Sequence, residues 1–168
     1  LVEERRLVLW SRAQAEQDFL DEIGLLGALP ALDPEDGGFA VTVTNATGNK
    51  IDSFLTRDVD VSEQTLPDGK RQLVADVTLT NHAPTSGLPP YVIDNELGLP
   101  VGTNRTLVTL YGATGIQSVT RDGQPIGVER FPEAGWFGHR SAVDIRAGRS
   151  VTYRAVFALD GPGDGAFE

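Results

Sequence analysis

The chain has 168 residues, and its 24 Asp and Glu outnumber its 14 Lys and Arg, which gives a formal net charge of -10 at pH 7. This charge repels nucleic acid and anionic membrane surfaces, and the sequence contains no basic patch to offset it, so neither is expected as a partner. The absence of Cys excludes disulfides, thiolate nucleophiles and Cys-ligated zinc. Apolar runs are short and interrupted by charges, so the chain is not expected to insert directly into a membrane.

The N-terminal region predicts a short strand followed by one α-helix. Residues 6–10 have the composition of a strand, and Ser11 and Gln14 are spaced as the N-cap and N3 residues of a capping box. Gly24 or Gly27 is expected to end the helix. Apolar residues recur at the spacing of one helix face, at Ala15, Phe19, Ile23 and Leu26.

Composition divides the chain into three regions. We interpret residues 1–33 as the closing strand and helix of an upstream α/β domain. The chain begins "LVEERRLVLW" without an initiator Met, so we expect further chain before it. Residues 38–160 are expected to form a β domain, and residues 161–168, which are acidic and rich in Gly, a flexible tail.

Beyond residue 38 the apolar pattern has the period of two that is typical of strands. The first such residues are Phe39, Val41 and Val43. A second set, predicted to share one strand face, is Ile51, Leu55, Val59 and Val61. Residues 66–70, "LPDGK", predict a turn because Pro67 presets its own φ and Gly69 tolerates a positive φ. The return strand is expected to turn Leu73, Ala75, Val77 and Leu79 inward.

A Pro-rich loop is expected at 82–102, and more strands follow it. They are predicted at 105–113, 116–121, 124–131, 141–145 and 151–159. Asp122 and Gly123 form the strongest short-range hairpin signal in the chain. Seven or eight short strands separated by turn residues predict a mainly β fold, an antiparallel β-sandwich of immunoglobulin-like or related topology.

A polar segment, "NATGNK" at 45–50, interrupts two apolar runs. An anion-binding loop would need a helix after its glycine, whereas the residues from Ile51 onward alternate like a strand. We therefore predict a tight connection in which Gly48 or Asn49 takes a positive φ and Asn side chains bond nearby backbone. Asn45 also begins an N-glycosylation triplet.

No motif for catalysis, for a metal or for a cofactor is present. His82 and His139 have no Cys or helically spaced His nearby, and there is no G-x-S-x-G motif. No catalytic residue, metal ligand or cofactor is therefore expected. The acidic, Gly-rich segments at 33–38 and 160–165 offer oxygen ligands for calcium but lack EF-hand spacing.

A carbohydrate site is the binding alternative that the sequence leaves open. Asp58 and Asp60 alternate on one strand face beside Asp52, with neighbours about 7 Å apart by strand geometry. Tyr91 and Trp136 offer an aromatic platform for sugar rings. For both groups we favour a structural interpretation: a solvated strand face for the carboxylates, and aromatic rings that close the end of the core.

Three stretches together resemble the C-terminal part of the bacterial domain of unknown function 4012 family, from about Arg6 to Leu159. They are "LVLWSRAQAEQDFLDEIGLLGALP", "NATGNKIDSFLTRDVDV" and "GTNRTLVTLYGATGIQSVTRDGQPIG". The resemblance is carried by an Asn-x-x-Gly-x-Lys-x-Asp pattern and by an Arg in the strand that follows it. The residues concerned are Asn45, Gly48, Lys50, Asp52 and Arg57.

The resemblance implies an extracytoplasmic, membrane-anchored protein of the bacterial cell envelope, in which the glycosylation triplet is incidental. It carries over no catalytic residue. The expected function is that of a non-catalytic β-sandwich module that makes domain or envelope contacts; the alternative is a domain that binds or processes cell-wall glycans. Expected partners are the upstream domain of the same polypeptide and a wall glycan or envelope protein. Asn45, Lys50, Asp52 and Arg57 are the candidate interface or ligand residues.

Overall fold

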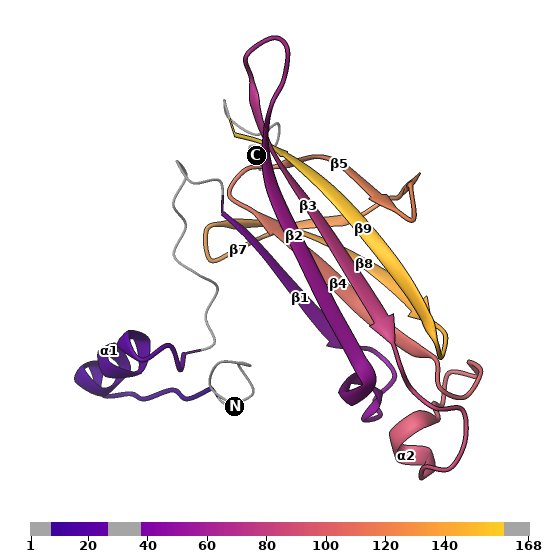
Figure 1. The fold of residues 1–168 in the computed structure, drawn as a ribbon. Coiled ribbons are helices and arrows are strands. Elements are labelled where there is room, and N and C mark those ends of the chain that lie inside the picture. The colour runs from indigo at the N-terminus through magenta and orange to yellow at the C-terminus, as the bar shows by residue number, and fades with distance from the viewer. Residues whose placement is uncertain (1–7, 27–37, 160–168) are drawn as a thin grey trace. The chain divides into compact units, whose positions relative to one another are not determined.

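The computed structural model describes residues 8–26 and 38–159 (Figure 1). The chain divides into two compact units, Leu1–Ala31 and Leu32–Glu168. Each unit is described by itself below.

The first unit contains helix α1, Gln14–Glu22, which begins later than predicted. Its N-cap is Ala13, whose side chain cannot cap, and Ser11 lies two residues earlier. The Ser11 backbone N–H donates to Gln17 Oε1 over 2.9 Å, and its hydroxyl donates to Glu16 Oε2 over 2.5 Å. These bonds to the first turn hold Ser11 outside the helix. Ser11 and Gln14 therefore do not form the predicted capping box.

The end of α1 confirms the prediction of a glycine stop. Gly24 has a φ of 71°, and its N–H donates to the Asp21 carbonyl over 2.9 Å. The Leu25 N–H donates to the Leu20 carbonyl over 2.8 Å, which completes a Schellman motif. The predicted strand at 6–10 is wrong for residues 8–10, which form no strand because the Leu9 N–H bonds the Leu25 carbonyl beside the helix end; residues 6 and 7 lie outside the described ranges.

The second unit is the predicted antiparallel β-sandwich (Figure 1). The four-stranded sheet has the order β1 (Phe39–Asn45), β4 (Asn104–Gly112), β8 (Trp136–Ile145), β7 (Glu129–Glu133). The five-stranded sheet has the order β2 (Leu55–Thr65), β3 (Arg71–Asn81), β9 (Arg149–Ala158), β5 (Ile116–Arg121), β6 (Gln124–Pro125). Two short helices, η1 (Ile51–Phe54) and α2 (Pro90–Ile93), lie in the connections at one end.

Alternating apolar residues of facing strands form the core. The inward residues predicted for β3 are buried, and β9 buries every second residue, which confirms both patterns: Leu73, Ala75, Val77, Leu79, Val151, Tyr153, Ala155 and Phe157. The opposite sheet contributes Val108, Leu110, Val143 and Ile145. Each fully buried large apolar side chain stabilises the fold by roughly 1.5–3 kcal/mol.

Two predicted turns are confirmed. Gly69 has a φ of 86°, and the Leu66 N–H donates to the Lys70 carbonyl over 2.8 Å. Asp122 and Gly123 both have positive φ, 51° and 77°, as a type I′ hairpin turn requires.

The predicted strand at 124–131 is two strands in different sheets. β6 remains beside β5, whereas β7 pairs with β8. The Ile126 N–H still donates to the Val119 carbonyl of β5 over 3.3 Å, and the chain crosses to the other sheet before β7 begins at Glu129. The chain therefore crosses between the two sheets at a place where the sequence predicted one continuous strand.

The prediction for residues 51–61 is also wrong in part. Ile51 begins the 3₁₀ helix η1 and is fully buried, because the Asn49 side chain accepts its N–H and the chain turns before β2 begins. Val59 and Val61 lie on the predicted strand, but they are 43% and 44% exposed. They belong to an edge strand, where only one neighbour covers each side chain.

Candidate functional site

The polar segment at 45–50 is organised by the side chain of Asn45. Its Oδ1 accepts the N–H groups of Thr47 and Gly48 over 2.6 and 3.2 Å, and its Nδ2 donates to the Asn49 carbonyl over 3.1 Å. Gly48 has a φ of 74°. The segment is therefore the tight connection that the sequence predicted, with Gly48 at the positive φ.

Asn49 ties this connection to the loop that follows β3. Its Nδ2 donates to the Asp94 carbonyl over 2.6 Å, across 45 residues of sequence. The Lys50 N–H donates to the Tyr91 carbonyl over 3.2 Å. The two loops are thus fixed together at one end of the sandwich, which we call the loop end.

A second amide, that of Asn95, shapes the neighbouring loop. Its Oδ1 accepts the N–H groups of Leu97 and Leu99 over 3.1 and 3.0 Å, and its Nδ2 donates to the Leu99 carbonyl over 3.1 Å. Asp94 Oδ1 in turn accepts the Asn95 N–H over 2.8 Å. Side-chain hydrogen bonds therefore hold the backbone on both sides of the loop end.

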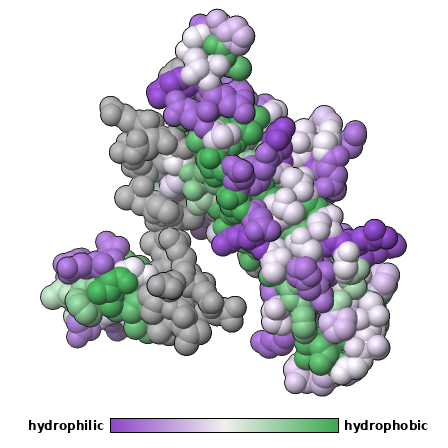
Figure 2. Space-filling view, viewed as in Figure 1, coloured by the Kyte–Doolittle hydropathy of each residue, from purple (hydrophilic) through white to green (hydrophobic). Residues whose placement is uncertain are grey.

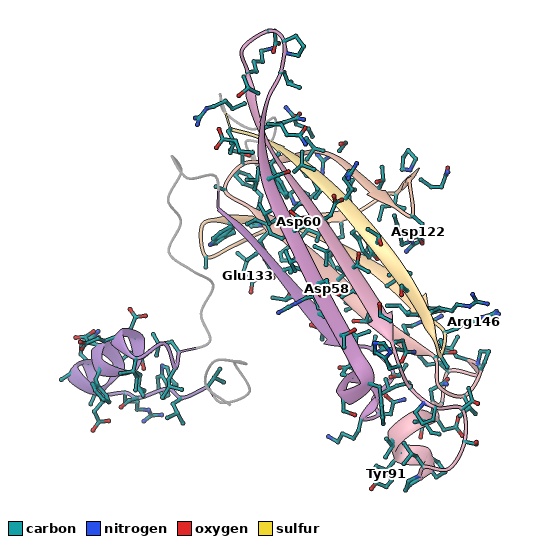
Figure 3. The ribbon with its side chains drawn as sticks, in the orientation of Figure 1. Asp58, Asp60, Tyr91, Asp122, Glu133 and Arg146 are labelled. Carbon is teal, nitrogen blue, oxygen red and sulfur yellow. The ribbon has the colours of Figure 1, made fainter. Side chains whose placement is uncertain are left out.

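The two loops enclose an open hollow of about 470 Å³, the loop-end pocket. Its lining residues are Thr47, Gly48, Asn49, Pro90, Tyr91, Asp94, Asn95 and Glu96. Tyr91 is 69% exposed, and Figure 3 shows it beyond the strands at the loop end of the sandwich. Amide groups, two carboxylates and one aromatic face suit the pocket to a polar, uncharged or cationic surface.

Two of the four candidate interface residues bond residues that line this pocket without lining it themselves. Asn45 and Lys50 support its wall through the bonds described above. Asp52 lies beside them in η1, where its Oδ1 accepts a hydrogen bond from Asn104 Nδ2 over 2.9 Å. Because Asn104 is fully buried, this bond anchors η1 to the start of β4.

Arg57 does not lie at the loop-end pocket. It belongs to β2, and its Nη1 donates to the Val41 carbonyl over 3.1 Å. Val41 is in β1, so this contact links the edge strands of the two sheets. The role of Arg57 in the fold is to join these edges.

The four carbohydrate candidates do not come together. Asp58 and Asp60 lie along the middle of β2, whereas Tyr91 is at the loop end (Figure 3). Trp136 is 2% exposed and starts β8 at the opposite end, where its ring fills the space beside Gly38. The alternative of an aromatic platform is therefore not formed by Tyr91 and Trp136, and the favoured interpretation, in which Trp136 closes the end of the core, is confirmed for that residue. Asp52 bonds Asn104 and does not continue the row of Asp58 and Asp60.

Neither histidine belongs to a metal-binding group within the described ranges. His139 is buried, and burial lowers its pKa; its Nε2 accepts the Ile116 N–H over 3.4 Å. His82 Nε2 lies 3.1 Å from the Thr56 hydroxyl. Residues 8–26 and 38–159 contain no group of three or more His, Asp and Glu placed to hold a metal. The segments considered for calcium, 33–38 and 160–165, lie outside the described residues except for Gly38.

Sequence reasoning missed the contribution of Asp94, Asn95 and Glu96. The prediction treated 82–102 as a loose loop, although Asp94 and Asn95 are turn-forming residues followed at a short distance by Gly98, which has a φ of 71°. This turn chemistry was the available signal. It could not reveal that Asn49 would reach the same loop from far along the chain.

Comparisons with family models, with curated proteins and with solved structures each gave no match for this chain. In the part of the chain that the structure describes, neither α-helix has the length and apolar character that a membrane span requires.

Proposed function

We propose that this chain is a non-catalytic β-sandwich module of a membrane-anchored, extracytoplasmic protein of the bacterial cell envelope, and that it makes domain or envelope contacts through its loop end. The observation that supports this function is the pair of loops that the Asn45 and Asn95 side chains shape and that the Asn49 side chain joins across 45 residues of sequence. The envelope location rests on the family resemblance alone.

A fixed surface is suited to binding because its ordering entropy is lost on folding and not again on association. At the loop end, hydrogen bonds join Asn49 to the Asp94 carbonyl and Lys50 to the Tyr91 carbonyl. These bonds leave the Tyr91 ring, 69% exposed, and the Glu96 side chain available to a partner. The upstream domain of the same polypeptide is the first partner we propose.

Hydrogen exchange tests this function. We expect amides at 45–53 and 90–96 to exchange more slowly in the full-length membrane-bound protein than in the 168-residue chain, because a docked partner excludes water. The hairpin tip at 66–70 serves as the internal control and should exchange equally in both. Equal exchange of the loop-end amides would contradict the proposal, as would recovery of the full-length protein in the cytosolic fraction.

A second candidate function is binding of a cell-wall glycan, and the exposed Tyr91 ring favours it. Aromatic faces pack on the apolar faces of sugar rings, while amide and carboxylate groups such as those of Asn49 and Glu96 bond hydroxyls. Of the carbohydrate candidates taken from the sequence, Tyr91 is the residue that lines the loop-end pocket.

Titration with purified wall polysaccharide, followed by NMR shifts, separates the two candidates. A glycan site predicts that Tyr91→Ala weakens binding by about tenfold or more, since one aromatic stacking contact contributes on the order of 1–2 kcal/mol. Tyr91→Phe should retain most of the affinity. Leu66→Ala, at the exposed hairpin tip, is the matched control. Binding that is unchanged in Tyr91→Ala, or absent altogether, eliminates the glycan site and leaves the contact function untouched.

A further inference from the structure

β2 is an edge strand with an open side. Within residues 8–26 and 38–159 it pairs with β3 alone, over its full length of 11 residues. Every residue from Thr56 to Thr65 is exposed. The backbone N–H and C=O groups that point away from β3 therefore form a long row that a further strand can bond.

The outward face of this edge carries two carboxylates, Asp58 and Asp60, that form no ion pair with any described residue. In the ladder register Asp60 lies opposite Asp76, and Asp76 lies opposite Arg154. Arg154 binds Asp76 with two hydrogen bonds of 2.8 and 2.7 Å. The cross-strand row therefore contains the carboxylates of Asp60 and Asp76 and the guanidinium of Arg154. Asp60, at the outer end of this row, is unpaired within the described part of the chain.

Asp58 lies at the outer end of the next cross-strand row on the same face of the sheet. It lies opposite Thr78, which bonds Thr152 through their hydroxyls over 3.0 Å. No hydrogen bond or ion pair reaches the Asp58 carboxylate from the described residues. Because side chains two apart on a strand share a face, Asp58 and Asp60 present their charges about 7 Å apart along the edge.

Between Arg57 and Glu63, the inward face of the same edge is apolar and incompletely covered. Val59 lies opposite Val77 and Val61 opposite Ala75, both of which are fully buried, yet Val59 and Val61 remain 43% and 44% exposed. Figure 2 shows hydrophobic surface over β1 and β2 beside hydrophilic residues. An incoming strand would cover these two side chains on one face while meeting the carboxylates on the other.

We propose that the β2 edge binds an extended segment of a partner protein in which basic residues alternate with apolar ones. Two Lys or Arg side chains of this segment, spaced two residues apart, would lie opposite Asp58 and Asp60. Each would form an ion pair with the carboxylate that it faces. The apolar residues between and beside them would pack on Val59 and Val61. Directly opposed side chains have Cβ atoms about 4.5–5.5 Å apart, which is close enough for both kinds of pair.

A second copy of this chain fits the edge poorly. Its net charge is also -10, so the two copies repel. An antiparallel pair centred on Val59 would set Asp58 of one copy against Asp60 of the other. The carboxylates of Asp58 and Asp60 therefore disfavour pairing between two copies of the chain and favour a basic partner. This surface is separate from the loop end, and the inference does not depend on the proposed function.

The test uses the 168-residue chain and a synthetic (Lys-Val)₄ peptide as the probe. We expect saturable binding, with NMR shifts centred on Val59 and Val61 and slowed hydrogen exchange at every second amide of β2. Asp58→Lys with Asp60→Lys should weaken binding by at least about tenfold, since each cross-strand charge pair contributes up to about 1 kcal/mol and each reversal adds repulsion. Asp21→Lys with Glu22→Lys, on α1, makes the same change in net charge and should leave binding intact.

Two further peptides test the alternating pattern. (Glu-Val)₄ should not bind, and (Lys-Ser)₄ should bind more weakly because it leaves Val59 and Val61 uncovered. Equal binding by (Lys-Ser)₄, equal loss in the α1 control variant, or shifts away from β2 would each overturn the proposal. So would an absence of binding, or dimers in light scattering that pair through β2, since the carboxylates would then have only a protective role or none.

Discussion

Asn45 determines the shape of the loop end through both atoms of its amide. Its Oδ1 accepts two backbone N–H groups, and its Nδ2 donates to the Asn49 carbonyl. Removing such a side chain leaves several backbone groups without a hydrogen-bond partner. This loss typically lowers the free energy of unfolding by about 1–3 kcal/mol.

We therefore expect Asn45→Ala to lower the free energy of unfolding by about 2 kcal/mol in urea titrations. Asn45→Asp should have a smaller effect, because it retains the accepting oxygen and loses only the donor. Ser62→Ala, on the exposed edge strand, is the control and should change stability by less than about 0.5 kcal/mol. An Asn45→Ala variant as stable as the control would show that the Asn45 bonds contribute nothing to the fold.

His139 gives the domain a dependence on pH that can be assigned to one residue. Burial lowers the pKa of His139 in the folded state, with a smaller effect from the nearby Arg130 charge, so the unfolded chain binds the proton more readily. Stability is complete above the unfolded pKa of about 6.5 and declines as pH falls below it. Hydrogen bonds from arginines lower the pKa of Asp76 and Asp144, and these groups reduce stability mainly below about pH 5.

We expect the free energy of unfolding to decrease between about pH 7.5 and 5.5, and His139→Gln to flatten that slope. Urea titrations at each pH measure it. His82→Gln, at an exposed site, should retain the wild-type slope. A slope that survives in His139→Gln would assign the pH dependence to another group.

At the scale of the element, β4 and β9 approach closely across the core at Gly112. A Cβ at this position would overlap the buried Phe157 ring and come within 2.9 Å of the Thr114 carbonyl oxygen. Gly112 is therefore required by the facing strand and not by its own backbone.

Gly112→Ala should destabilise the sandwich by about 1–3 kcal/mol, the usual range for overpacking a core. Gly127→Ala is the matched control, because a Cβ there would meet nothing within 4 Å. Thermal unfolding of both variants measures the difference. Equal melting temperatures would mean that Phe157 shifts without loss.

The apolar pattern of neighbouring residues predicted the central strands well and the edge strands of the two sheets poorly. The period of two in β3 and β9 requires burial on one face only, and the structure buries those residues. The same period in residues 59–61 predicted that Val59 and Val61 share one strand face, but it could not indicate how many neighbours the strand has or how completely that face is covered. The division of 124–131 into β6 and β7 depends on which sheet receives each piece, and neighbouring residues carry no such information.

The candidate site was predictable to the extent that it is local. Asn45 and Gly48 follow turn chemistry and were identified, whereas the pairing of Asn49 with the loop at 94–95 depends on how the strands between them fold. For Trp136 the sequence favoured a ring that closes the end of the core, which is confirmed, but it left an exposed platform open because an aromatic residue at the end of a strand suits both positions.

For the whole molecule, sheet order determines how the chain folds. β3 pairs with β9, and β1 pairs with β4, so most of both sheets joins segments that are far apart in sequence. Domains dominated by such pairing fold in milliseconds to seconds because loop closure precedes the stabilising contacts.

We accordingly expect stopped-flow refolding, followed by the fluorescence of buried Trp136, to have its main phase in the range of about 1 ms to 1 s. Trp10 is exposed, so Trp10→Phe provides the control that removes its background signal. A main phase in microseconds would mean that local contacts dominate folding.

The contact between the Phe39 and Phe157 rings, whose centroids are 5.9 Å apart, has a mechanical consequence. It brings the first residue of β1 beside the end of β9, so the chain enters and leaves the sandwich at the same end. Tension applied between residues 38 and 159 would therefore act on β1 at its outer end and separate it from β4 one hydrogen bond after another. β9, held between β3 and β5, would resist for longer, so under load the four-stranded sheet would lose its edge first.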